Sequence, residues 1–317
     1  MTTFAVTGAF GFSGRHIAAR LVDRGDQVRN LTNHPDRPDP FAGRVPCIPL
    51  ALDDEAALTR GLQGIDVLVN TYWVRYDHGG AGHALAVERS ARLFRAAATA
   101  GVERIVHVSI ANPDPTSPLS YYRGKAAVEA ALAAAGPSFG ILRPTVLFGD
   151  HPILPNAIAY LLRRIPVFGI PGDGRYGIQP VAVEDLADLA IELADDGANR
   201  TVDAVGPEVF TFREFVTAIR DAIGSHAVLL PTPAPIALAA AGLLGRALGD
   251  VILTREELDG LMAGLLVSHE PALGVTRFTD WFAANADWLG CTHLSELADH
   301  YHAGQPQCRL AARLLGA

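Results

Sequence analysis

Short apolar runs alternate with longer, helically patterned segments through the first half of the chain. The apolar runs lie at Phe4–Val6, Gln27–Leu31, Val45–Leu50, Ile65–Asn70, Arg104–Ser109 and Phe139–Leu142. This alternation predicts βαβ units, in which each apolar run is a strand of a parallel sheet and each longer segment is a crossover helix.

The longer segments carry alanine or leucine at helical spacing. They span Gly14–Arg24, Glu55–Leu62, Ala84–Ala100 and Ser120–Ala135. A glycine stands at or near the end of each segment, where helices commonly stop. Six strands largely separated by helices predict an α/β fold with a doubly wound parallel sheet.

The pattern changes after Gly149 to proline-rich and glycine-rich connections. Helices follow, with short strand-like pieces at Thr201–Val205 and Ala227–Leu230. We therefore expect a doubly wound domain over residues 1–150, and a mixed segment over residues 151–317. The second segment is expected to complete the sheet and to form a smaller, mainly helical substrate cap.

The composition is that of a globular protein, because 49% of the 317 residues are hydrophobic and 19% are charged. The formal net charge of -8 disfavours nucleic acid or an anionic membrane as the main partner, since either needs a concentrated basic face. The apolar stretch Pro235–Gly245 is shorter than the roughly 20 residues of a spanning helix. We expect a buried or interfacial helix there and no membrane span.

The cysteines, Cys47, Cys291 and Cys308, are far apart and odd in number. This arrangement favours neither a disulfide framework nor a metal site and indicates a reducing compartment. The chain also enters its first apolar run at Phe4, without the charged leader and apolar core of a secretion signal. We therefore expect a cytoplasmic protein.

A glycine-rich turn, TGAFGFSG at Thr7–Gly14, follows the first predicted strand and opens the first predicted helix. In this context Gly8 permits a tight turn, Gly11 lets the backbone approach a pyrophosphate, and Gly14 lets the helix pack close to the strand. We count Phe10 and Phe12, which stand between the glycines, among the cofactor-binding residues. The alternative is an ordinary strand-to-helix turn.

No carboxylate stands at the end of the second predicted strand, which reads Thr32-Asn33-His34-Pro35. A protein specific for NAD holds the ribose 2′-hydroxyl with such a carboxylate. Without it a 2′-phosphate is not repelled, and Thr32 and Asn33 offer hydrogen bonds while Arg37 or Arg15 supplies charge. The pattern slightly favours NADP and leaves NAD open.

Of the 26 basic residues, 25 are arginine and one is Lys125. Tyr121 precedes this lysine by four residues, so the two side chains share a helix face. A cation beside a phenol lowers the pKa of the phenol and makes tyrosine a usable acid or base near neutral pH. Tyr122 could compete with Tyr121 for this role, but its three-residue spacing from Lys125 matches the pair less well. The alternative for Lys125 is a solvated lysine on the surface of a helix.

These motifs resemble the short-chain dehydrogenase/reductase superfamily, in its extended and atypical branch of epimerase/dehydratase-like and complex-I-subunit-like proteins. The resemblance covers most of the chain. It rests on TGAFGFSG, VLVNT at Val67–Thr71, VHVS at Val106–Ser109, YYRGK at Tyr121–Lys125, ILRPTVLFG at Ile141–Gly149 and QPVAVEDLA at Gln179–Ala187.

The resemblance implies an NAD(P)-binding Rossmann domain with a defined set of roles. Gly8, Gly11 and Gly14 would bind the pyrophosphate, and Asn70 would lie beside the cofactor. Lys125 would hold the nicotinamide ribose and Tyr121 would act as the acid and base. Arg143 and Pro144 would begin the wall between cofactor and substrate.

Two positions depart from the family pattern. Ile110 stands where a serine or threonine usually holds the substrate carbonyl, with Ser109 one residue early, so Ser109 is a catalytic candidate whose alternative is a hydroxyl that caps backbone. Ala51 stands where an aspartate usually binds adenine, with Asp53 and Asp54 slightly late. The second departure predicts weaker cofactor binding or adenine held through backbone alone.

Tyr72, Trp73 and Arg75 follow the fourth predicted strand and are expected at the mouth of the substrate cleft, where they suit a flat or acidic substrate. Tyr176, in the turn-rich loop Gly172–Tyr176, is a further substrate candidate. Packing against the cap and a plain surface turn are the respective alternatives. The 11 histidines form no zinc-ligand motif, the pair His300 and His302 included, and we predict no metal.

The leading hypothesis is an NAD(P)-dependent oxidoreductase or epimerase that acts on a small hydroxyl- or carbonyl-bearing substrate. The alternative is a non-catalytic NAD(P)-binding redox sensor, scaffold or assembly protein, which Ile110 and Ala51 favour. The superfamily resemblance also makes a homodimer possible. The second half has no obvious cluster of basic residues for a second diphosphate, so a nucleotide-sugar substrate is unsupported.

Overall fold

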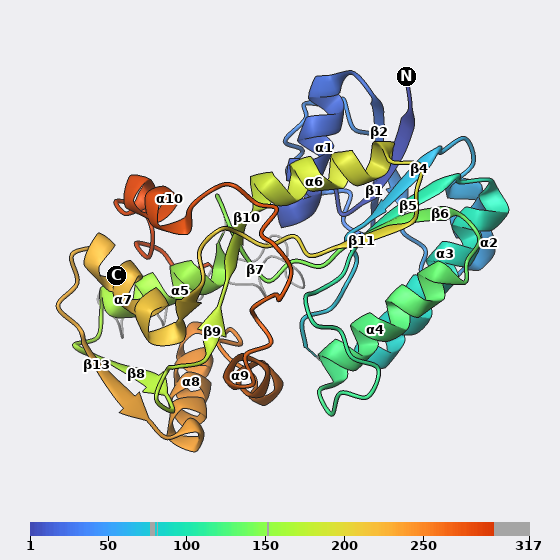
Figure 1. Cartoon of the computed structure of the whole chain (residues 1–317). Helices are drawn as coiled ribbons and strands as arrows, with labels where there is room; N and C mark the ends of the chain where they lie inside the picture. Colours follow the sequence, from blue (N-terminus) through green and yellow to red (C-terminus); the bar gives the residue numbers. More distant parts are fainter. Residues whose placement is uncertain (77–79, 81, 151, 295–317) are drawn as a thin grey trace. The chain divides into compact units, whose positions relative to one another are not determined.

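The computed structural model describes residues 1–76, 80, 82–150 and 152–294. The chain forms two compact units (Figure 1). The first unit contains Met1–Pro144, Val183–Val205 and Glu270–Gly274. The second contains the two segments between these ranges and the described residues from Val275 onward. The first unit therefore takes back a helix and a strand from the second half of the sequence.

A seven-stranded sheet forms the centre of the first unit. Its strands are β1 (Thr3–Thr7), β2 (Gln27–Thr32), β3 (Cys47–Pro49), β4 (Val67–Asn70), β5 (Arg104–Val108), β6 (Ser138–Leu142) and β11 (Arg200–Val202). They stand in the order β11-β6-β5-β4-β1-β2-β3, and every neighbouring pair is parallel. Because all strands run the same way, their carboxyl ends meet at one edge of the sheet.

Helices cover both faces of this sheet (Figure 1). Helices α1 (Phe12–Arg24) and α6 (Val183–Asp195) pack together on one face. Helices α2 (Glu55–Gly61), α3 (His83–Ala100) and α4 (Ser120–Ala133) pack side by side on the other. The doubly wound α/β fold predicted from the sequence is confirmed.

The predicted strands and helices of the first half are all present, with bounds that differ by a few residues. The piece predicted at Thr201–Val205 is β11, which pairs with β6 at the outer edge of the sheet. The third strand is shorter than predicted, because β3 is an edge strand of three residues and only Asn30, Leu31 and Thr32 pair with it.

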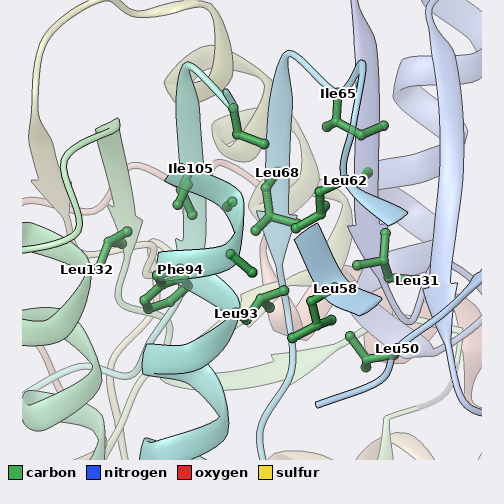
Figure 2. Packing of buried hydrophobic residues seen from close by; sticks show 14 of the residues in the cluster. Leu31, Leu50, Leu58, Leu62, Ile65, Leu68, Leu93, Phe94, Ile105 and Leu132 are labelled. Atoms are coloured by element: carbon green, nitrogen blue, oxygen red, sulfur yellow. The ribbon is translucent and has the colours of Figure 1, made fainter. Parts of the chain in front are cut away.

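The core between the sheet and helices α2 to α4 is made mainly of leucine, alanine and isoleucine (Figure 2). Leu68 of β4 has 0% of its surface exposed, and Ile105 of the adjacent β5 is equally buried. Leu93 and Phe94 reach this cluster from α3, and Leu132 reaches it from α4 (Figure 2). The apolar runs of the sequence are buried on both faces, as a two-sided parallel sheet requires.

The second unit is mainly helical and has its own core. Its helices are α5 (Ile153–Leu162), α7 (Phe212–Ala222), α8 (Ala234–Leu248), α9 (Arg255–Met262) and α10 (Phe278–Asn285). Three short strand pairs accompany them: β7 (Val146–Phe148) with β10 (Pro180–Ala182), β8 (Val167–Pro171) with β13 (Val228–Thr232), and β9 (Gly177–Ile178) with β12 (Phe210–Thr211). Aromatic rings fill the core, where Phe215 and Phe278 stack with centroids 4.8 Å apart.

The apolar stretch at Pro235–Gly245 is helical and belongs to α8. We expected a buried or an interfacial helix there, and burial is wrong for most of it. Only Gly245 and Leu248 of this helix are buried, while Ile236 is 58% and Leu243 is 66% exposed. Among the described residues, no helix is long and apolar enough to cross a membrane.

Replacement of Leu68 by alanine should destabilise the first unit by about 2–5 kcal/mol, because it removes buried methyl groups and leaves a cavity between sheet and helices. Urea unfolding measures this change. The matched control is Leu273→Ala in the same unit, since Leu273 is 43% exposed and its loss should cost no more than about 0.5 kcal/mol. Equal effects of the two substitutions would contradict this view of the core.

Candidate cofactor and active site

The turn between β1 and α1 is built for close approach of its two ends. Gly8 has φ +65° and its N–H donates to the carbonyl of Leu31, while a Cβ on Gly14 would lie 2.2 Å from the Gly8 carbonyl oxygen. Gly11 precedes the helix as a cap that has no side chain, so the first N–H groups of α1 point out of the turn without a side-chain acceptor. This cradle fits a pyrophosphate, since backbone N–H groups and the helix N-terminus favour an anion.

A buried chain of polar side chains holds this turn against the ends of the neighbouring strands. The side chain of Asn30, on β2 beside the edge strand β3, accepts from the N–H of Ala9 over 2.8 Å. Thr7 donates to Asn70 over 3.2 Å, and Asn70 contacts the Nδ1 atom of His107 over 3.1 Å. The structure thus places Asn70 beside the glycine turn, at the carboxyl ends of β1, β4 and β5.

A cavity of about 360 Å³ opens next to the ends of β2 and β3. It is lined by Asn33, by the segment 50–54 and by Arg89 of α3. Asp53 forms a two-pronged pair with Arg89 at 2.6 and 3.0 Å, and this pair lowers the pKa of the carboxyl. Ala51 and Asp53 therefore stand in one cavity wall. A heterocycle in this cavity would meet backbone and an ion pair in place of a free carboxylate.

The end of β2 presents its two candidate residues differently. The hydroxyl of Thr32 is buried and accepts from the N–H of His34 over 2.9 Å, so it serves the local turn. Asn33 is exposed and faces the cavity. Arg37 lies in the same turn, where its N–H donates to the His34 carbonyl.

Lys125 lies on the inner face of α4, and only 3% of its surface is exposed. Its ammonium donates to the carbonyl of Val108, at the end of β5, over 3.0 Å. Burial lowers the pKa of Lys125 to about 7, although the carboxylate of Glu129 opposes this shift. The surface-lysine alternative is wrong for the structure, because the side chain lies in the interior.

One aromatic ring, that of Trp73, lies over the head of this lysine, and two further rings pack against Trp73. The indole of Trp73 lies with its centre 4.7 Å from the Lys125 ammonium, a cation–π distance. Trp73 is stacked on the His83 ring and meets Tyr121 edge to face, with centroids 5.7 and 5.8 Å apart. Gly124 allows this approach, since a Cβ there would lie 2.9 Å from Trp73. Tyr121, Lys125 and Trp73 form one cluster.

Ser109 points into a buried ionic network. Its hydroxyl donates to Glu129 over 2.5 Å, and Arg143 donates to both oxygens of the same carboxylate at 3.0 and 2.5 Å. Ile110, the residue that follows, is buried and apolar. The Pro144 carbonyl accepts from the N–H of Ala111 over 2.8 Å, which ties the segment after β6 to the segment after β5.

The remaining candidates differ in how the structure uses them. Burial raises the pKa of Tyr72, whose hydroxyl bonds the Arg89 guanidinium. The carbonyl of Arg75 accepts from His83 Nε2 over 3.2 Å. Tyr176 belongs to the second unit, where its hydroxyl donates to the Pro171 carbonyl and its ring stacks on Phe212.

Phe10 and Phe12 flank the turn, with rings near Phe41 and His16 respectively. His83, Glu129 and Arg89 were not singled out from the sequence. No short motif marks them, because each joins the site through a contact between segments far apart in the chain.

Metal-ligand groups are missing from the described part of the chain, where no three His, Cys, Asp or Glu side chains are arranged to hold an ion. Cys47 and Cys291 are free thiols there. Cys308, His300 and His302 lie outside the described residues.

Comparison with known proteins places this site in a family. A family model described as NAD(P)H-binding matches residues 8–196, which include the glycine turn, the cavity, the Tyr121–Lys125 pair and β6. The NAD(P)-binding Rossmann domain that the resemblance implied is confirmed, because this match shows an NAD(P)H-binding family and the solved structures show the same fold.

Two relatives illustrate the range of proteins that this sequence is similar to. It is 29% identical over 250 residues to NADH dehydrogenase (ubiquinone) 1 alpha subcomplex subunit 9, mitochondrial, of Arabidopsis thaliana, which covers 74% of this chain and 61% of that protein. It is 30% identical over 227 residues to (4-alkanoyl-5-oxo-2,5-dihydrofuran-3-yl)methyl phosphate reductase of Streptomyces griseus, covering 69% and 73% respectively. The chain thus spans about three fifths of the plant relative's length.

Among solved structures, the fold is similar to that of the NADPH-dependent quinone oxidoreductase of Escherichia coli in complex with NADPH. The TM-score is 0.73 at 21% identity, over 89% of this chain and 99% of that chain. At this identity the likeness shows the fold.

His107 should make the protein less stable as the pH falls. Burial and the nearby charge of Lys125 lower the pKa of His107 to about 3, whereas an unfolded histidine takes up a proton near pH 6.5. Between these values the unfolded state binds one more proton, so the free energy of unfolding falls by about 1.4 kcal/mol per pH unit on acidification.

The His107→Asn variant lacks this proton, and its free energy of unfolding should fall less steeply between pH 6.5 and pH 4 by about that amount per pH unit. Urea unfolding at a series of pH values measures the two slopes. His34→Asn, at an exposed position, is the control that should follow the wild type. Identical slopes for wild type and His107→Asn would refute the burial effect.

Proposed function

The chain belongs to the NAD(P)H-binding family, and from that premise we propose that it is an NADPH-dependent reductase of a small carbonyl compound. The observation that carries the proposal is the cluster at the carboxyl ends of β4 and β5, where Tyr121 and the buried Lys125 lie together. The bound nicotinamide would supply the hydride.

The cofactor half of the proposal rests on the cradle and the cavity of the first unit. Gly8, Gly11 and Gly14 would hold the pyrophosphate through backbone N–H groups and the start of α1. The cavity lined by Asn33, residues 50–54 and Arg89 is large enough for an adenosine half. No carboxylate directly follows Thr32, and the two carboxylates of the cavity wall are already engaged, Asp53 by Arg89 and Asp54 by the N–H of Ala57. A 2′-phosphate at Asn33 would therefore meet little repulsion. NADPH is therefore favoured over NADH.

The chemical half rests on the proton that Tyr121 would give to the substrate oxygen. A protonated Lys125 next to Tyr121 favours the phenolate, which lowers the cost of proton release. Lys125 would also hold the nicotinamide ribose, and Asn70 and Pro144 would border the same cofactor half. This division of roles requires Lys125 to be charged while Tyr121 acts.

The proposed site departs from the family at the carbonyl-holding residue. Ser109 gives its hydroxyl to Glu129, and Ile110 has no donor to offer. We therefore assign polarisation of the carbonyl to Tyr121 alone and treat Ser109 as a support of the ionic network. Tyr72, Trp73 and Arg75 are proposed to contact the substrate. Their rings suit a flat, apolar carbonyl compound.

The second candidate function is a non-catalytic NAD(P)H-binding subunit. Its support is the likeness to a subunit of mitochondrial NADH dehydrogenase, together with the ion pair that occupies the wall of the cavity at Asp53. In this case cofactor binding would stabilise the fold or report its redox state, and the partner would be a protein.

Asn33→Asp should weaken NADPH binding by at least about tenfold, or about 1.4 kcal/mol, because the new carboxylate would repel the 2′-phosphate. NADH binding should stay equal or become tighter. Fluorescence titration with each dinucleotide measures both dissociation constants. Gln27→Glu adds the same charge at the far end of β2 and should leave both values unchanged. An equal loss for NADH and NADPH would argue against a 2′-phosphate at Asn33.

Tyr121→Phe should lower the turnover of small aldehydes, ketones or quinones by about 10²–10⁴-fold while NADPH still binds, because the variant loses the proton donor and keeps the ring. Oxidation of NADPH followed by absorbance measures turnover. Tyr122→Phe is the matched control and should retain activity. Failure of the wild type to bind either dinucleotide would reject both functions, and tight binding without turnover of any carbonyl would favour the subunit.

A further inference from the structure

We propose that Glu129 is a positioning residue that keeps Lys125 protonated, through a carboxylate held one helical turn away and fixed by Ser109 and Arg143. This inference rests on the role that the proposed function gives to Lys125. Glu129, Ser109 and Arg143 belong neither to the glycine turn nor to the Tyr121–Lys125 motif. The proposal gives their hydrogen-bond network a function that these two motifs do not explain.

Glu129 follows Lys125 by four residues on α4, so both side chains project from the inner face of the helix. Both are buried, with 9% and 3% of their surfaces exposed. Glu129 Oε1 accepts from Ser109 and from Arg143 Nε, and Oε2 accepts from Arg143 Nη2. Two charge-assisted bonds and one hydroxyl bond hold this carboxylate in place on the inner face of α4.

An ammonium in the interior loses hydration, and Lys125 has little to replace it. In the part of the chain that the structure describes, the Val108 carbonyl is its one hydrogen-bond acceptor. The Trp73 face adds a cation–π contact. Glu129 is therefore the negative charge that offsets the burial of Lys125, and without it the neutral amine would be favoured.

The other titratable or charged groups around Lys125 do not supply this charge. They are Tyr121 on α4, His107 on β5, His83 behind Trp73, and Arg143 beyond Glu129. The histidine on β5 is held neutral by burial, and Arg143 is a cation that opposes a second positive charge. The balance at Lys125 depends on one carboxylate and on one competing guanidinium.

The network also explains why the Ser109 hydroxyl is not free to hold a substrate carbonyl. Ser109 donates to Glu129, so that Oε1 accepts two hydrogen bonds while Oε2 accepts one from Arg143. The same bonds would form if the network only held α4 against the segment after β6 and had no effect on Lys125. The two roles differ in one measurable property, the pKa of Lys125.

Because Lys125 is the one lysine of the chain, protein made with ¹³Cε-labelled lysine gives a single lysine signal. Its chemical shift against pH reports the pKa of Lys125 in the cofactor-free protein, whether or not the protein is a reductase. Glu129→Gln should lower this pKa by about one unit or more, which is a tenfold smaller ratio of charged to neutral amine at fixed pH. Both the lost carboxylate and the unpaired guanidinium act in this direction.

Arg143→Gln should shift the same pKa upward, because it removes the competing cation and leaves the carboxylate. If the two substitutions only loosened the packing of α4, they would not shift the pKa of Lys125 in opposite directions. Glu88→Gln on α3 is the matched control. Like Glu129, Glu88 pairs with an arginine, here Arg92, but its side chain is exposed. It should leave the lysine signal unchanged.

A folded Glu129→Gln protein whose Lys125 pKa stays within about 0.3 units of the wild type would overturn the proposal. If that variant does not fold, the upward shift in Arg143→Gln decides, and its absence overturns the proposal equally. A loss of turnover in Tyr121→Phe without any lysine shift in the Glu129 variant would leave the proposed function intact and reject this role for Glu129.

Discussion

The parallel direction of all seven strands is the constraint on which the rest of the first unit depends. It brings the carboxyl ends of β1, β2, β4 and β5 to one edge, where loops that follow different strands meet. The glycine turn can then close because Gly14 lies against the Gly8 carbonyl without a Cβ between them. Every candidate residue of this unit is placed by a strand end or by the helix that follows it.

Polar groups at this edge are buried, and most of them have a partner there; among the described residues, His107 Nε2 and Trp73 Nε1 have no hydrogen-bond partner. Asn30 accepts from the backbone of the glycine turn, while Thr7, Asn70 and His107 form a chain across three strands. Lys125 has a carbonyl, an aromatic face and a carboxylate around it. Such a network is costly when a partner is lost, which links the order of the site to the stability of the sheet.

The structure supports both a reductase and a subunit without turnover, for identifiable reasons. In a reductase the clustered tyrosine and lysine would provide acid chemistry, whereas the structure pairs Ser109 with Glu129 and Asp53 with Arg89. These pairings do not abolish a cofactor site, since the pyrophosphate cradle consists of backbone. Whether the protein is active would therefore depend on the charge state of Lys125 and on what Tyr121 contacts.

The sequence alone predicted the order of strands and helices, because apolar periodicity and glycine stops are local properties of the chain. It also predicted the glycine turn and the Tyr121–Lys125 pair, whose members are neighbours along one segment. Only the tertiary structure decided that Lys125 is buried under Trp73, that Ser109 faces Glu129, and that Arg89 closes a cavity with residues 50–54. Those contacts join segments far apart in the sequence, and packing, which no local pattern encodes, determines which polar groups meet and which charges lose their water.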